Sequence, residues 1–222
     1  MLRSLNFSLI LWFFSNFYYA QVKDAGFWLS GNLEKNISGL FTVNFNPQLR
    51  LNENFTELGT YFFDTGLGYE LPKINLKFSA NYRFSQKRNL ENTYNARHRF
   101  YCDANYKLRK KKFQFTYRFR YQHQFKDINK SADWQDPSNY LRNKFAIKFK
   151  PEKTVRPFVF MDTWFRISTP IREFDNIRLG FGLDIEIDKY QSLSPSIFMD
   201  KEFNVSNPFT NFIIGLDYSF SF

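Results

Sequence analysis

Arginines and carboxylates that alternate with apolar residues are the side chains of this sequence best suited to recognition chemistry. Arg118 and Arg120 stand two residues apart among phenylalanine and tyrosines, and Asp184 and Glu186 repeat the spacing among leucine and isoleucines. Guanidinium groups bind carboxylates and other oxyanions through paired hydrogen bonds. The chemistry that these residues offer is therefore the pairing or binding of negative charge.

Residues that usually carry covalent catalysis are scarce by comparison. The sequence contains two histidines, His98 and His123, and one cysteine, Cys102. Both histidines fall on the apolar side of an alternating segment, and neither has a sequence neighbour that suggests a nucleophile and its base. A single cysteine forms no internal disulfide, and so few histidines and cysteines do not make a soft-metal site. We expect no enzyme activity, no metal and no cofactor.

The charged residues lie on segments with a two-residue repeat. From Ile74 to Ser85 apolar residues alternate with polar ones, and the segments 95–108, 113–125 and 177–188 repeat the pattern. Such alternation predicts β-strands with one apolar and one polar face. Strands in globular proteins average about 5–6 residues, whereas a tilted strand needs about 9–11 to cross a bilayer. The length of these segments favours a membrane barrel.

Weaker strands complete the pattern, and short connections alternate with long ones, as in outer-membrane barrels. They are expected at 27–34, 40–50, 57–70, 140–149, 156–168, 192–203 and 209–222. The total is eleven, whereas single-chain bacterial barrels have even numbers. Either the first segment does not span, or one strand is missed or split. The prediction is one all-β domain over residues 21–222, a transmembrane antiparallel up-and-down β-barrel of 10–12 strands.

The composition supports a barrel and argues against nucleic acid as a partner. Aromatic residues make up 21% of the chain, yet the mean hydropathy is −0.48. A barrel reconciles the two, because its strands turn apolar side chains to lipid and polar ones inward. The net charge of +10 is spread over the strands instead of forming one patch. The basic run 109–112 is the exception, and it is expected to be a solvated turn.

Both ends of the chain carry export signals. Arg3, an apolar run from Leu5 to Tyr19 and then Ala20 predict that residues 1–20 are a secretory signal peptide. The last strand resembles the terminal signal that the barrel-assembly machinery recognises in outer-membrane proteins. Its outward residues are Leu216, Tyr218, Phe220 and Phe222. We therefore expect the bacterial outer membrane as location, with its lipid and the assembly machinery as partners.

The polar face of each strand would turn toward the lumen. The candidate lumen-lining residues are Arg83, Arg97, Arg99, Arg118, Arg120, Arg142, Lys144, Asp162, Arg166, Arg178, Asp184 and Glu186. Acids and bases are interleaved among them, which favours ion pairs across a closed lumen. The excess of positive charge allows the alternative of a wet lumen that favours anions.

The order of these features resembles a family of exported bacterial proteins known as domain of unknown function 2490 (DUF2490). The resemblance covers most of the chain after the signal. It is carried by Trp28, Gly31, Leu33, Glu34, Lys35, Leu49, Arg50, Asp64, Gly66, Leu67, Tyr69, Tyr82, Arg83, Phe84, Arg97, Arg99, Tyr117–Tyr121, Arg142, Arg178 and Gly180. Where the family has a glutamate near the middle of the eighth strand, this sequence has Asp162. The resemblance implies an outer-membrane barrel and names no substrate or reaction.

Three classes of function remain at this point. The favoured one is a structural or accessory barrel of the cell envelope with a charge-networked lumen. The alternative is a narrow anion-preferring porin or channel for small acidic solutes, and a barrel enzyme comes last. A structural barrel would need an envelope protein partner, which Trp134 in the longest predicted loop could contact.

Overall fold

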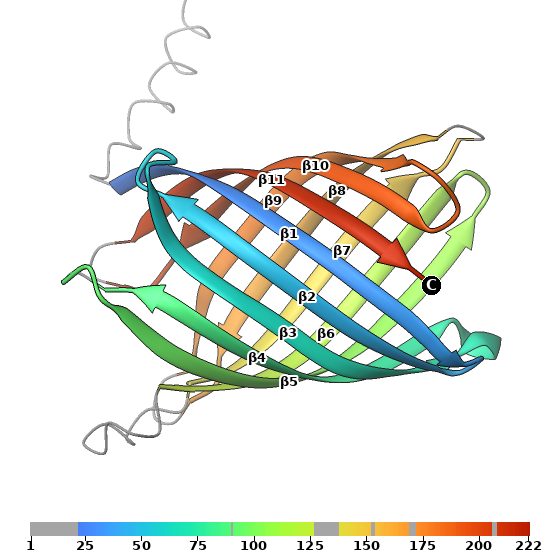
Figure 1. Cartoon of the computed structure of the whole chain (residues 1–222), viewed down its shortest axis with the longest axis horizontal. Coiled ribbons are helices and arrows are strands. Elements are labelled where there is room, and N and C mark those ends of the chain that lie inside the picture. The colour runs from blue at the N-terminus through green and yellow to red at the C-terminus, as the bar shows by residue number, and fades with distance from the viewer. Residues whose placement is uncertain (1–21, 90, 127–137, 152–153, 169–171, 206–207) are drawn as a thin grey trace, which may run out of the picture.

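A single closed β-barrel contains all the regular strands of the computed structural model (Figure 1). The structure describes residues 22–222 except 90, 127–137, 152–153, 169–171 and 206–207. Within these ranges the strands are β1 (Val22–Ser38), β2 (Phe41–Asn52), β3 (Glu57–Leu71), β4 (Leu76–Arg88), β5 (Tyr94–Lys110), β6 (Phe113–Lys126), β7 (Ser138–Phe149), β8 (Val155–Arg166), β9 (Glu173–Glu186), β10 (Gln191–Glu202) and β11 (Phe209–Ser221). The predicted signal peptide and Trp134 lie outside the described residues.

The barrel closes through a parallel seam. Every strand pairs antiparallel with its sequence neighbours, but β1 and β11 pair parallel from Val22↔Phe209 to Glu34↔Ser221. With eleven strands in the described chain, the first and last run in the same direction, so their pairing has to be parallel. The predicted β-barrel is confirmed. The expectation of an even strand number and of antiparallel pairing throughout is wrong, because β1 is a full member of the barrel.

The connections divide the barrel into two ends. Short connections follow β1, β3, β5, β7 and β9, and this end is called the turn end; the others lie at the loop end, where the longest, 127–137, follows β6. A 3-10 helix, Pro72–Ile74, joins β3 to β4 at the turn end. Of the basic run predicted to be a solvated turn, Lys111, with a φ of 53°, and Lys112 form the turn, whereas Arg109 and Lys110 are exposed residues at the end of β5. No helix of the described chain is long and apolar enough to cross a membrane.

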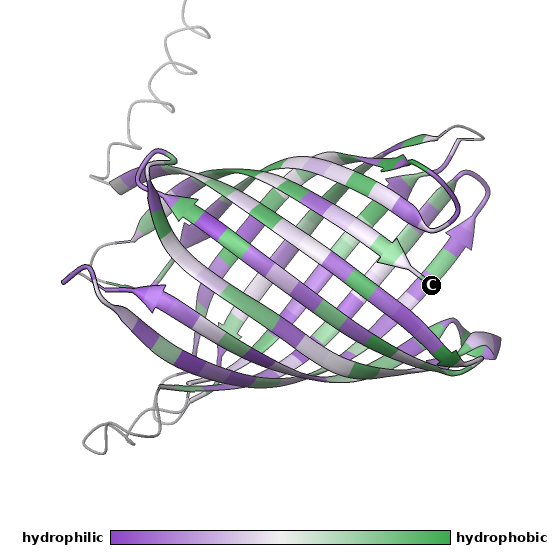
Figure 2. Cartoon of the chain, in the orientation of Figure 1, coloured by the Kyte–Doolittle hydropathy of each residue, from purple (hydrophilic) through white to green (hydrophobic). Residues whose placement is uncertain are grey.

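The outer surface of the barrel is apolar. Leu67 and Phe181 are 63% and 59% exposed, and similar side chains line the outside of every strand. Figure 2 shows hydrophobic and hydrophilic residues alternating along the strands. Because successive side chains of a strand point to opposite faces, the same strands turn their polar residues inward. The strands therefore have the apolar outer face and the polar inner face that the sequence predicts.

The interior is mainly polar and charged. Most of the side chains buried in the described chain are polar, among them Thr42, Asp64, Asn81, Asp103, Arg120, Gln122, Arg142, Asp162, Asp184, Ser196 and Thr210. A smaller apolar cluster consists of Trp28, Phe198 and Ile213, with Phe160 packed against it. The barrel thus buries charge where a soluble domain would bury an apolar core.

Candidate functional site

The lumen is the candidate functional site. It contains a cavity of about 710 Å³ lined by side chains from all eleven described strands. The lining extends from Gln114 and Lys148 near the turn end to Arg50 and Asp175 near the loop end. Nine of the lining residues are Arg or Lys and four are Asp. The space inside the barrel is therefore polar and carries an excess of positive charge.

Most of the predicted lumen residues meet at this cavity. Eight of the twelve line it, namely Arg83, Arg99, Arg118, Arg120, Arg142, Lys144, Asp162 and Arg178. The other four lie toward the ends of the barrel and outside the cavity lining: Arg97 and Arg166 at the loop end, and Asp184 and Glu186 at the turn end. Arg50 also lines the cavity but was not among the predicted lumen residues, although it lies on the polar side of the alternating pattern in β2.

Two arginines form bidentate ion pairs with the residue directly opposite on the neighbouring strand. Arg83 donates from Nε and Nη2 to the two carboxylate oxygens of Asp64 over 2.6 and 2.7 Å. Arg120 binds Asp103 over the same two distances. In each pair the arginine and the aspartate stand directly opposite each other on adjacent strands. The planar guanidinium can then bind both oxygens of the carboxylate at once. Each pair therefore lies flat along the barrel wall.

Other ion pairs reach slightly further around the wall. Asp162, which is 2% exposed, accepts from Arg142 on the next strand over 2.8 Å and from Arg118 one strand beyond over 3.2 Å. Lys148 binds Asp184 over 2.6 Å, two strands away. In the described chain no ion pair joins strands more than three positions apart. The predicted pairing across the lumen is wrong, because the bases that form ion pairs do so with acids on nearby strands.

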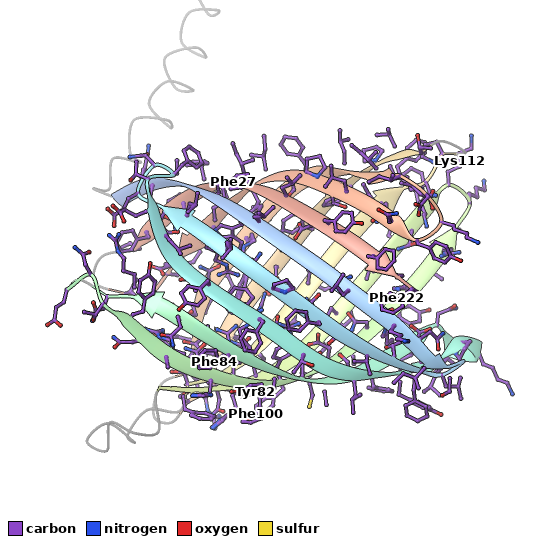
Figure 3. The ribbon with its side chains drawn as sticks, in the orientation of Figure 1. Phe27, Tyr82, Phe84, Phe100, Lys112 and Phe222 are labelled. Carbon is purple, nitrogen blue, oxygen red and sulfur yellow. The ribbon has the colours of Figure 1, made fainter. Side chains whose placement is uncertain are left out.

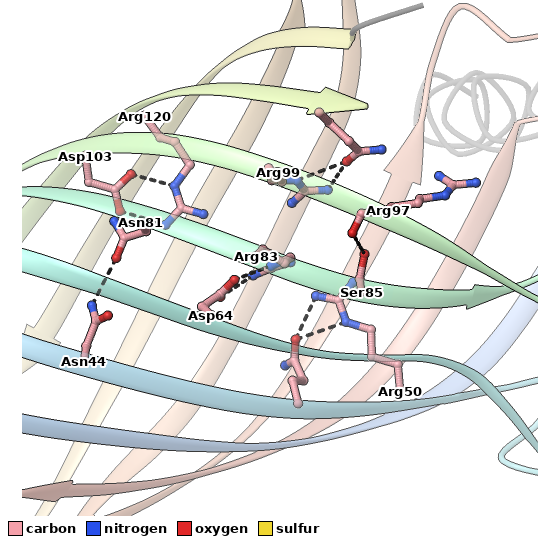
Figure 4. Close-up of polar contacts among 12 residues, drawn as sticks. Asn44, Arg50, Asp64, Asn81, Arg83, Ser85, Arg97, Arg99, Asp103 and Arg120 are labelled. Carbon is pink, nitrogen blue, oxygen red and sulfur yellow. Dashed lines mark hydrogen bonds and ion pairs between the residues drawn. The ribbon is translucent and has the colours of Figure 1, made fainter. Parts of the chain in front are cut away.

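Arg50 and Arg99 are held differently, by neutral glutamines. Arg50 donates from Nε and Nη2 to Oε1 of Gln48 over 3.1 and 2.8 Å. Arg99 donates from the same two nitrogens to Oε1 of Gln124 (Figure 4). Neither arginine takes part in an ion pair among the described residues. Both guanidinium groups are thus fixed in place while their charge is not neutralised.

One side of the lumen is aromatic, which the sequence pattern did not predict. We call Trp28, Phe158, Phe160, Trp164 and Phe198 the aromatic wall; they come from β1, β8 and β10, and Ile213 of β11 packs against Trp28 and Phe198. Trp28 and Phe198 meet edge to face with ring centroids 5.1 Å apart. The rings share the parity of charged or polar residues in their strands, Phe160 with Asp162 in β8 and Phe198 with Asp200 in β10, so a prediction of charged lumen residues passes over them.

Glycines make room for this aromatic wall. A Cβ added to Gly180 would lie 2.8 Å from the ring of Phe160 and closer still to Phe198. At Gly182 it would lie 2.6 Å from the ring of Phe158 and from the Pro195 carbonyl oxygen. Real Cβ atoms do not approach so closely, so β9 needs glycine where rings from β8 and β10 cross it.

Cations on the strands next to the aromatic wall lie over its rings. We call Arg50, Arg83, Arg99, Arg118, Arg120 and Arg142, with Asp64 and Asp103, the arginine wall; they come from β2 to β7. The guanidinium of Arg50 lies 3.5 Å from the ring centroid of Trp28, and that of Arg142 lies 4.0 Å from the centroid of Trp164. Such cation–π contacts are attractive. The rings therefore help to fix the cations that face the cavity.

The histidines and the cysteine lie on the outside of the barrel. Nδ1 of His98 is 2.7 Å from the hydroxyl of Tyr82, and Nδ1 of His123 is 2.7 Å from Oδ1 of Asn139. Figure 3 shows Tyr82 beside Phe84 and Phe100 on the outer surface. Cys102 is exposed. No group of three or more potential metal ligands occurs within the described ranges.

The turn end carries further basic residues beside the cavity. Lys150, in the connection after β7, donates to Oε1 of Gln114 over 3.3 Å. Burial, and then the positive charges of Arg109, Arg156 and Lys148, lower the pKa of the Lys150 ammonium below its ordinary value. Positive charge is therefore concentrated at this rim of the lumen.

Fold and site together define a closed β-barrel with a polar, basic lumen. The family model described as "Protein of unknown function (DUF2490)" matches residues 25–209, and the chain belongs to this family. No curated protein sequence matches the chain. Among solved structures, the crystal structure of the beta domain of the Bordetella autotransporter BrkA is similar, with a TM-score of 0.45 and 7% identity over 79% of this chain and 81% of that chain.

Proposed function

We propose that this protein is an outer-membrane β-barrel whose lumen is a narrow, anion-preferring pathway for small acidic solutes. The apolar outer surface supports the membrane location, because a surface of exposed leucines and phenylalanines is stable against lipid and not against water. Short connections at one end and longer ones at the other match the usual orientation, with the turn end in the periplasm.

The observation that carries the pathway is the layout of charge in the cavity. The ion pairs run along the wall, so pairing does not close the lumen. The cavity of about 710 Å³ that remains between these pairs supports the pathway, as does Asp217, which lines the cavity and is exposed. An excess of fixed positive charge in a narrow polar passage attracts anions and repels cations.

A structural or accessory barrel is the second candidate, and the ion-pair network favours it. Bidentate pairs such as Arg83 with Asp64 and Arg120 with Asp103 join adjacent strands and make the wall rigid. Such a barrel would act through its surface on an envelope protein partner and would conduct no ions. The two candidates therefore differ in a property that can be measured directly.

The test is a current recording of the purified barrel in a planar bilayer under a KCl gradient. We expect steady openings whose reversal potential shows a preference for chloride. In the double variant Arg50→Ser/Arg99→Ser the preference should fall, and because both arginines are held by glutamines, no carboxylate loses its partner. Arg88→Ser is the matched control, since Arg88 pairs with Glu53 and Glu57 at the loop end and does not line the cavity.

Two results would contradict the pathway. If a barrel whose folding is verified by its heat-modifiable migration in gels carries no current, the result would favour the structural candidate. A preference for potassium would contradict the role of the basic lumen.

A separate experiment tests the membrane location and the recognition of the chain by the barrel-assembly machinery. In cells, the protein should sediment with the outer membrane, and removal of Phe222 should lower the amount of assembled barrel. The loss should exceed the effect on the refolded protein, because Phe222 is 53% exposed and contributes two backbone hydrogen bonds, with Glu34 and Asn36, and ring contacts with Phe220 and Lys35 at the end of the barrel. Equal losses in both settings would contradict recognition of the terminal residues by the barrel-assembly machinery.

A further inference from the structure

We propose that Arg50 and Arg99 form a binding site for a multivalent oxyanion, of which a phosphate group is the simplest example. The proposal rests on the proposed function, since the ligand would be a solute inside the lumen. It goes further by naming the residues that hold the anion and the chemistry of the group held.

The comparison with the two bidentate ion pairs carries the proposal. Arg83 and Arg120 use Nε and Nη2 to bind a carboxylate, and Arg50 and Arg99 use the same two nitrogens to bind an amide oxygen. In both cases a neighbouring side chain fixes the guanidinium. A carboxylate offsets most of the positive charge of its arginine, whereas an amide leaves that charge unpaired. The two glutamine-held arginines are therefore positioned like the paired ones and remain available to an anion.

The donor groups that remain face the cavity. Nη1 of Arg50 and Nη1 of Arg99 make no hydrogen bond to any residue that the structure describes. Both arginines line the cavity. The guanidinium of Arg50 also rests on the face of Trp28, which leaves its edge as the open side. Planar donors presented edge-on suit phosphate and carboxylate oxygens.

The surrounding charges make an anion favourable here. Arg83 and Arg178 lie close enough to Arg50 to repel its guanidinium, and Arg83 and Arg120 act on Arg99 in the same way; Asp200 and Asp64 offset part of this repulsion. Figure 4 shows Arg83 and Arg99 on the adjacent strands β4 and β5, with Arg50 on β2 beyond Asp64 of β3. Repulsion among these cations is stronger in a protein-lined cavity than in bulk water. A ligand with two or more negative charges would relieve it more than chloride can.

Binding is measured on the purified barrel in detergent, by calorimetry and by tryptophan fluorescence, with inorganic phosphate and glucose 6-phosphate as probes. We expect saturable binding of at least one of the two, with a fluorescence change that Trp28→Phe removes. Binding of inorganic phosphate would identify the free ion as sufficient. Binding of the sugar phosphate alone would mean that the aromatic wall also contacts the ligand.

The decisive variants are Gln48→Glu and Gln124→Glu. Each places a carboxylate where the amide was, so the arginine becomes paired as in Arg83 and Arg120, and we expect affinity to fall by about tenfold or more. Asn105→Asp is the matched control, because it adds the same charge elsewhere in the cavity lining. It should change the affinity by less than about twofold, as expected for a separate, screened position.

The proposal is overturned if the folded wild type shows no saturable binding, if both glutamate variants bind as well as the wild type, or if Asn105→Asp weakens binding as much as they do. If one glutamate variant does not fold, the other decides. Because no current is recorded, the result is independent of the channel: binding without conductance contradicts only the pathway, and conductance without binding contradicts only this site.

Discussion

The aromatic wall and the arginine wall enclose the same cavity but are held together by different forces. In the aromatic wall, rings interlock and glycine in β9 leaves space for them, so fit between shapes decides stability. In the arginine wall, each side chain depends on one particular partner, as Arg83 depends on Asp64. The comparison shows how one barrel can combine a wall held by the fit of its rings with a wall held by ion pairs. The second wall still keeps unpaired positive charge, at Arg50 and Arg99.

The largest effect is expected where the two walls meet, at Asp162. In Asp162→Asn, Arg118 and Arg142 both lose their carboxylate while they remain inside the barrel. Removing one partner of a buried ion pair costs about 3–5 kcal/mol. Urea unfolding of the refolded protein in lipid vesicles measures the loss.

The control for this prediction is Glu57→Gln, which removes an exposed carboxylate from Arg88 at the loop end. Its effect should stay below about 1 kcal/mol, as for other exposed pairs. Similar losses for the two variants would mean that burial does not distinguish the arginine wall from the rim.

An intermediate effect is expected in the aromatic wall from Gly180→Ala. The added methyl group would overlap Phe160 and Phe198, which are held by their neighbours, and overpacking of this kind costs about 1–3 kcal/mol. Gly31→Ala is the matched control, because its nearest neighbour, the ring of Pro47, would lie 3.4 Å away. If the two variants unfold at the same urea concentration, shape does not govern this wall.

The smallest effect is expected from the unpaired charge of the arginine wall, and it should change gradually with the salt concentration. Raising the salt concentration shortens the screening length from about 10 Å at 0.1 M to about 3 Å at 1 M. The chloride preference of the pathway should therefore decline smoothly as KCl is raised on both sides of the bilayer. A preference that stays constant with salt would point to pore width, not to the arginines, as its cause.

The sequence predicts the strands and their faces well, and for a physical reason. In β4, β5, β6 and β9 one parity is apolar and the other polar, so a residue such as Arg118 or Phe119 has only one suitable side. The positions of the connections follow in the same way. The membrane-facing position of His98 and His123 was predicted by parity as well, and the structure places both on the outer surface.

The alternating pattern does not predict which side chains pair with one another in the lumen. Parity places Arg50 and Arg83 inside but does not reveal that one meets a glutamine and the other an aspartate, because that depends on register and on side-chain reach. The aromatic wall was missed for another reason, since Phe158 and Phe160 share the parity of Asp162 and would point inward with it, but the lumen residues predicted there are all charged. The parallel seam follows from the count of eleven strands, which the sequence pattern supplied and which the expectation of an even number set aside.

Spin labels on β5 test most directly which face of the barrel meets lipid. Cys102, the single cysteine of the sequence, points outward, and Asn105, three residues along the same strand, lines the cavity. A nitroxide is attached either to Cys102 or to residue 105 in Cys102→Ala/Asn105→Cys, and its collisions with oxygen, which enriches in lipid, and with a water-soluble nickel complex are compared in vesicles. We predict that oxygen dominates at 102 and nickel at 105; nickel dominating at 102 would contradict the account.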